Sequence, residues 1–138
     1  MSSVFGKNVK VSIFGESHGT AIGCVVDGFP AGVTLDRDLM ECVLSRRRAK
    51  SDRTTTTRVE RDEPEFLSGL KDGVTTGAPI AAIFKNENTR SVDYTGFENT
   101  PRPSHSDYSA TMRYRGFSDY RGGGHFSGRL TAPLCIAG

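Results

Sequence analysis

Two histidines stand in short segments whose residue types could support proton transfer. His18 lies in GESHG, Gly15 to Gly19, where the glycines let the backbone approach a ligand closely and are expected to present the ring at the surface. His105 lies in PRPSHSDY, where two prolines hold the backbone extended. Because the imidazole pKa is about 6.5, either ring could give or take a proton near neutral pH. A polar turn and a rigid surface loop are the alternative interpretations.

Arginine-rich and glycine-rich segments could bind a small polyanion, because the planar arginine fork matches carboxylate and phosphate groups. The arginines cluster in two stretches, which contain Arg46, Arg47, Arg48, Arg53, Arg58 and Arg61, then Arg102, Arg113, Arg115, Arg121 and Arg129. The segment YRGGGHFSGR could cradle a phosphate, since free backbone N–H groups and the dipole of a following helix favour an anion. Its glycines lack the GxGxxG spacing of a dinucleotide fingerprint. The alternatives are a plain linker and a solvated basic helix end.

The composition and the residue spacing exclude several classes of protein. With a formal net charge of +2, the chain suits a small anion better than a nucleic acid. The three histidines lack helical metal-ligand spacing and the three cysteines form no CxxC pair, so we expect no metal and no disulfide, with the cysteines buried. No apolar run approaches the roughly 20 residues that cross a bilayer. With no signal-peptide core either, we expect no membrane partner and a cytoplasmic location.

The hydrophobic pattern predicts strands and helices around these segments. The expected strands are 9–13, 21–26, a hairpin over 66–76, and 79–84. The expected helices are 36–48, 107–112 and 127–137. Asp107 could cap its helix or orient His105, and we expect the cap. The apolar run 130–137 is expected to need a partner surface, so we expect an incomplete domain.

Taken together, the segments resemble the chorismate synthase family. GESHGTAIGCVVDGFPAG is similar to its amino-terminal signature, RRRAKSDRTTTTR to its arginine segment, PRPSHSDY to its second histidine segment and DYRGGGHFSGRLTAP to its glycine-rich segment. The resemblance covers essentially the whole chain and implies that residues 1–138 are the amino-terminal part of a chorismate synthase domain. It implies an α/β fold of the β-α-β sandwich type, with mixed or antiparallel sheets packed against helices.

The activity that the resemblance implies is that of a lyase in aromatic amino acid biosynthesis. The reaction is an anti-1,4-elimination of phosphate from 5-enolpyruvylshikimate 3-phosphate, which gives chorismate in the last step of the shikimate pathway. Reduced FMN is required, and NADPH serves as its reductant in members that reduce their own flavin. A homotetramer is implied for the full-length protein. Members run well past 138 residues, so activity of this chain alone is not expected.

The resemblance also implies roles for individual residues in catalysis and substrate binding. His18 matches the histidine that protonates the leaving phosphate. His105 matches the histidine that governs the protonation state of the flavin. Arg47, Arg48 and Arg129 are the expected partners of the substrate's phosphate and carboxylates.

Cofactor contacts are implied in the same way. Arg47 and Arg53 match positions attributed to the nicotinamide phosphate. His125, Phe126 and Ser127 fall where the family contacts FMN, although other members carry arginine and serine at the first two of these positions.

The competing hypothesis is a non-catalytic module that binds a polyanion or a nucleic acid. The arginine segments would bind phosphates, and Tyr114, Tyr120 and Phe126 would stack on bases. The low net charge counts against it.

Overall fold

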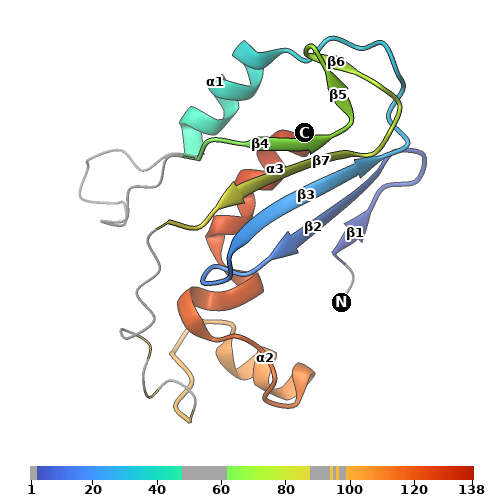
Figure 1. Ribbon diagram of the computed structural model, residues 1–138. Coiled ribbons are helices and arrows are strands. Elements are labelled where there is room, and N and C mark those ends of the chain that lie inside the picture. The colour runs from blue at the N-terminus through green and yellow to red at the C-terminus, as the bar shows by residue number, and fades with distance from the viewer. Residues whose placement is uncertain (1–2, 48–61, 88–93, 95, 97–98) are drawn as a thin grey trace.

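The computed structural model describes residues 3–47, 62–87, 94, 96 and 99–138, and it centres on one antiparallel sheet. The strand order is β1-β2-β3-β7-β4 (Figure 1). The strands of this sheet are β1 (Val4–Phe5), β2 (Lys10–Gly15), β3 (Ala21–Asp27), β7 (Ile80–Lys85) and β4 (Glu65–Ser68). Two further strands, β5 (Leu70–Lys71) and β6 (Val74–Thr75), pair as a separate hairpin.

Behind the sheet in Figure 1, α3 lies against β3 and β7, and α1 packs on α3. The helical elements are α1 (Arg37–Arg47), α2 (Asp107–Tyr114), the short 3₁₀ helices η2 (Arg121–Phe126) and η3 (Gly128–Leu130), and α3 (Thr131–Ala137). No helix of the described part is long and apolar enough to cross a membrane. The sheet and its helices match the α/β class expected from the sequence.

The core forms where alternate strand residues meet the helices. Successive strand side chains point to opposite faces of a sheet, so every second residue can be buried on the helix side. The buried apolar residues are Val11, Ile13, Ile22, Cys24, Val26, Ala82 and Phe84 from the sheet and Leu44, Leu130 and Ala132 from the helical elements. The apolar run 130–137 therefore has its partner surface within the described chain.

Two predicted elements are divided in the structure. The expected hairpin over 66–76 splits, because β4 pairs with β7 in the main sheet and only β5 and β6 form the hairpin. The expected helix 127–137 begins as η3, where the Ser127 side chain accepts a hydrogen bond from the Arg129 N–H, and becomes α-helical only from Thr131. The helix predicted to start at Asp36 is confirmed, since the Asp36 carboxylate accepts the Leu39 N–H at 2.9 Å.

Candidate active site

His18 lies in the turn between β2 and β3. The turn begins at Gly15, whose φ of +104° suits glycine and where a Cβ would stand 2.6 Å from the Ile22 Cα. The His18 side chain is buried, with 8% of the residue exposed, so the prediction of a surface ring was wrong. The edge of the Tyr94 ring contributes to this burial, with 4.8 Å between the ring centroids. A buried imidazole is shielded from competing water, which strengthens its interaction with any charged group placed beside it.

Hydrogen bonds hold the His18 turn from two sides. On one side, Asn86 at the end of β7 donates through its side-chain amide to the carbonyls of Glu16 at 3.0 Å and Gly19 at 2.8 Å. On the other, the Ser17 N–H donates to the Gly124 carbonyl at 3.0 Å. The backbone on both sides of His18 is therefore fixed by segments distant in sequence.

The glycine-rich segment brings the two predicted catalytic histidines together. Gly122 and Gly123 have φ of +58° and +91°. A Cβ on Gly122 would stand 2.5 Å from His18 Cε1, and a Cβ on Gly123 would stand 3.2 Å from His105 Cε1. The two histidine rings therefore lie against two adjacent residues that have no side chains. Consecutive glycines are needed here to leave room for the rings as well as to form the turn.

His105 is oriented by Asp107. The His105 Nδ1 lies 2.8 Å from a carboxylate oxygen of Asp107, and Arg102 binds the same carboxylate through its Nε and Nη2, each at 2.7 Å. Asp107 is the first residue of α2, whereas Ser106 occupies the cap position, so the expected capping role was wrong and the orienting role is the one observed. The contact places the ring proton on Nδ1 and leaves Nε2 facing Gly123.

Arginine partners keep two carboxylates of this region ionised. The hydrogen bonds from Arg102 hold the pKa of Asp107 well below its usual range, and Asp107 is buried. Arg121, just before the glycines, lowers the pKa of Asp119 in the same way. An ionised Asp107 accepts hydrogen bonds only, which fixes the direction of its contact with His105.

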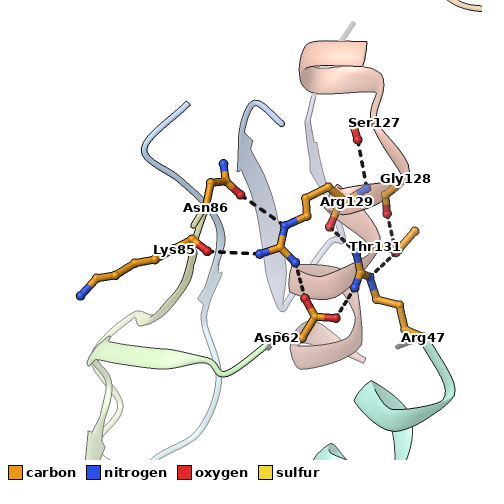
Figure 2. A network of polar contacts seen from close by, with 8 residues as sticks. All are labelled: Arg47, Asp62, Lys85, Asn86, Ser127, Gly128, Arg129 and Thr131. Atoms are coloured by element: carbon orange, nitrogen blue, oxygen red, sulfur yellow. Dashed lines mark hydrogen bonds and ion pairs between the residues drawn. The ribbon is translucent and has the colours of Figure 1, made fainter. Parts of the chain in front are cut away.

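A second polar cluster surrounds Asp62 (Figure 2). Its carboxylate binds Arg47, the last residue of α1, through one oxygen and Arg129 of η3 through the other. The side chains of Asp62 and Arg129 are 1% and 6% exposed, whereas that of Arg47 is 20% exposed. Arg47 also donates to the Thr131 hydroxyl at 2.8 Å. Two of the three arginines predicted for the substrate therefore meet at one buried carboxylate, and only Arg47 keeps appreciable exposure.

Asn86 connects this cluster to the histidines. Its side-chain oxygen accepts a hydrogen bond from Arg129 Nε at 3.2 Å (Figure 2). Its amide nitrogen donates to the Glu16 and Gly19 carbonyls of the His18 turn. Neither Asn86 nor Asp62 was predicted from the sequence. Position was a signal for Asn86 alone, because it directly follows β7, which has buried residues.

The three residues predicted to contact FMN have different surroundings in the structure. His125 turns its ring toward Gly15 and Ser3, and Ser127 caps η3. Phe126 lines a cavity of about 620 Å³. The cavity walls are Ser3, Ile13, Phe14, Gly15, Glu16, Tyr114, Phe117, Ser118, Asp119, His125 and Phe126. Its size is that of a ligand pocket, and its aromatic walls suit a flat ring system.

Two predicted site residues, Arg48 and Arg53, lie outside the described residues. Four described arginines, Arg47, Arg102, Arg121 and Arg129, pair with carboxylates of the chain itself. The described residues contain no group of three His, Cys, Asp or Glu side chains arranged to hold a metal ion.

Known proteins resemble the chain over nearly its whole length. A family profile described as Chorismate synthase matches residues 9–138. The curated Chorismate synthase of Chitinophaga pinensis is 51% identical over 134 residues, which are 97% of this chain and 40% of that protein. The Chorismate synthase of Thiobacillus denitrificans is 52% identical over 136 residues, 99% of this chain and 37% of that protein.

A solved structure agrees with these sequence matches. It is described as a crystal structure of chorismate synthase, and it has a TM-score of 0.61 at 26% identity over 94% of this chain and 31% of its own. The chain spans 37–40% of the length of the two curated relatives. The solved structure supports the α/β fold, and the relatives indicate that most of each protein lies outside the matched part.

Proposed function

Because the chain belongs to the chorismate synthase family, we propose that it carries part of the active site of an enzyme that makes chorismate. The reaction is the anti-1,4-elimination of phosphate from 5-enolpyruvylshikimate 3-phosphate, the family's lyase step in the shikimate pathway. Residues 1–138 are then the amino-terminal part of the enzyme domain. The observation that carries the proposal is the seating of His18 and His105 on the adjacent glycines 122 and 123.

In this proposal His18 is the general acid. Overall, the bond from the substrate ring to the phosphate oxygen breaks with its electron pair leaving on the phosphate, and the imidazole gives its proton to that phosphate. A ring hydrogen leaves as a proton, and the electrons of its C–H bond remain in the ring to form the new double bond. General acid catalysis of this kind typically supplies about 10²–10⁴-fold. Burial of the ring and the two-sided support of its turn favour this role, since a proton donor must be held within hydrogen-bond reach of the leaving group.

Arg47 is the proposed partner of a substrate anion, because its side chain is more exposed than that of Arg129. Asp62 and Arg129 are almost fully buried and hold its guanidinium from behind, and the cluster of two arginines and one carboxylate keeps one net positive charge. Arg129 therefore acts on the substrate through the placement of Arg47. Arg48 is proposed as a further partner on the strength of the resemblance alone.

The aromatic cavity fits a flavin in part. Phe14, Tyr114 and Phe126 would hold a flat ring system, but no lysine or arginine among the described residues lines the cavity to bind a flavin phosphate. Reduced FMN, when bound, supplies electron density for the elimination. His105, which Asp107 holds, is not among the described residues that line this cavity, so its proposed role in the protonation state of the flavin rests on the resemblance. We also propose that NADPH reduces the flavin and that Arg47 and Arg53 bind its phosphate. The whole protein is proposed to be a cytoplasmic homotetramer.

A chimaera tests the proposed function directly. The chain replaces the matching 40% of the Chitinophaga pinensis relative, and phosphate release from 5-enolpyruvylshikimate 3-phosphate is followed without oxygen, with FMN and dithionite. We expect turnover, and we expect His18→Ala to lower kcat by about 10²-fold or more at unchanged KM. A folded chimaera without phosphate release would refute the function. Full kcat with a raised KM in His18→Ala would make His18 a binding residue.

A further inference from the structure

The ring of His125 joins three separate segments of the chain. Its Nδ1 lies 2.9 Å from the Gly15 carbonyl oxygen, at the end of β2. Its Nε2 lies 2.8 Å from the Ser3 hydroxyl, just before β1. Both ring nitrogens are thus engaged by the chain itself, although the family resemblance would place a flavin contact here.

The partners decide where the ring proton sits. A carbonyl oxygen can only accept, so Nδ1 must carry a proton and donate it to Gly15. In the neutral ring Nε2 is then an acceptor and receives the hydroxyl proton of Ser3. This arrangement selects one tautomer, which makes the role of the ring measurable without any ligand.

The Gly15 carbonyl is the entry to the turn that carries His18. His125 holds this carbonyl, and its neighbour Gly124 accepts the Ser17 N–H at 3.0 Å. His125 and Gly124 therefore each bind the turn just before His18, His125 at the Gly15 carbonyl and Gly124 at the Ser17 N–H. A displacement of about 1 Å in a reacting group can lower the rate roughly 10²-fold. Hydrogen bonds that fix the backbone just before His18 therefore affect the rate of a reaction in which His18 is the acid.

We infer that His125 is a positioning residue for His18, and that its ring supports the turn through the hydrogen bonds of both ring nitrogens. The inference rests on the proposed catalytic role of His18. The substitutions His125→Asn and His125→Gln separate the two ring nitrogens, because the asparagine amide lies near the position of Nδ1 and the glutamine amide near that of Nε2.

Nitrogen NMR of the 138-residue chain tests the geometry independently of activity. The chain has three histidines, so long-range proton–nitrogen spectra are simple, and His125→Asn assigns the His125 signals. At about pH 8, where ordinary histidines are neutral, we expect a fixed proton on Nδ1 of His125. We also expect the His18 ring signals to shift in His125→Gln and to stay in place in His125→Asn. A His125 ring without a fixed Nδ1 proton would overturn the inference, as would unmoved His18 signals in His125→Gln.

Kinetics of the chimaera separate positioning from cofactor contact. We expect His125→Ala and His125→Gln to lower kcat about tenfold or more, with KM and the FMN Kd within about twofold, and His125→Asn to keep kcat within about threefold. A weaker FMN affinity in all three variants with unchanged kcat at saturation would show a flavin contact and refute the inference. Ser68→Ala is the matched control. Ser68 lies on β4, the edge strand farthest from β1, and the substitution removes its hydrogen bond to the Pro79 carbonyl.

The two proposals fail in distinguishable ways. If the chimaera releases no phosphate, the proposed function fails, while the tautomer and the His18 signals still decide whether His125 holds the turn. If the chimaera is active but all His125 variants match it in kcat, the function stands and the positioning role is wrong.

Discussion

The carboxylate of Asp107 binds both His105 and Arg102 and so fixes the positions of their side chains. Arg102 reaches it with its backbone N–H at 3.0 Å and with two guanidinium nitrogens, and His105 uses the remaining lone pairs. Charge-assisted and bidentate contacts of this type are the stronger hydrogen bonds in proteins. The carboxylate therefore contributes to stability as well as to the orientation of the His105 ring.

Asp107→Asn should lower stability in a pH-dependent manner. The pKa of Asp107 is depressed in the folded chain, so its contribution is present above the unfolded value of about 3.9 and is lost as the pH falls from there toward the folded value. We expect a loss of about 2 kcal/mol at pH 7, from the range for hydrogen bonds to charged groups. Below about pH 4 the difference from the parent chain should shrink.

Urea unfolding followed by circular dichroism at several pH values measures this difference. Asp38→Asn is the matched control, because Asp38 is also a carboxylate in the first turn of a helix but is exposed. An equal loss in both variants would assign the effect to the helix dipole and not to the contacts with Arg102 and His105.

The roles of individual residues could be predicted from the sequence only where the residue lies in a recognisable motif. His18 and His105 were singled out as a pair from the sequence, and the glycines that seat them were predicted only as an anion cradle. Asn86 and Asp62 were missed because their partners are distant in sequence, and local patterns contain no such pairs. The burial of His18 was missed for the same reason, since Tyr94 and the glycine segment reach it only through the fold.

At the level of elements, the strands and α1 followed from period-2 and helical patterns, whereas the 3₁₀ beginning of the helix expected over 127–137 did not. Hydrophobic periodicity predicted one continuous helix there, because it does not detect the change from 3₁₀ to α-helical backbone at Thr131. The division of the predicted hairpin has a similar cause, since a pattern does not tell whether a strand pairs with its neighbour or with β7.

The Asp62 cluster should be essential for the junction of α1 with η3. Asp62→Asn removes the charge while asparagine still tolerates the backbone φ of +28°. Because it removes the carboxylate charge that binds the buried Arg129, we expect the free energy of unfolding to fall by about 3–5 kcal/mol. Asp72→Asn, at an exposed turn residue with φ of +52°, should change it by less than about 0.5 kcal/mol. Similar losses in both variants would show that the ion pairs do not stabilise this junction.

Cysteine reactivity should report the placement of β3 and α1. Cys24 in β3 is 1% exposed and burial raises its pKa to about 11, whereas Cys42 in α1 is exposed, which contradicts the expectation that all three cysteines are buried. We expect alkylation of Cys24 at about pH 8 to be at least about 100-fold slower than that of Cys42, because the thiolate is the reactive form. Mass spectrometry of digested protein reads both rates, and urea should equalise them. Equal rates in the folded chain would contradict a central β3.

In the part of the chain that the structure describes, aromatic groups remain available around the cavity. Phe117 is 90% exposed, and Phe14 and Tyr114 are 39% and 37% exposed. The cavity also carries Glu16 and Asp119, which repel an anion. This chain thus offers walls for a flat ring but no cationic partner for a phosphate among its described cavity residues, and a resemblance built on linear motifs could not have revealed that imbalance.

The 138-residue chain alone should therefore fail as a chorismate synthase. A flavin phosphate normally gains several charge-assisted hydrogen bonds of about 1.5–3 kcal/mol each, and each 1.4 kcal/mol lost weakens binding about tenfold. With the described cavity supplying none from lysine or arginine, we expect FMN to bind at least about 10²-fold more weakly to the chain than to the chimaera. Purified chain with FMN, dithionite and 5-enolpyruvylshikimate 3-phosphate, kept free of oxygen, should release no phosphate above background. Turnover of about 1 s⁻¹ or faster, a rate ordinary for enzymes, would contradict this and show that these residues suffice for the reaction.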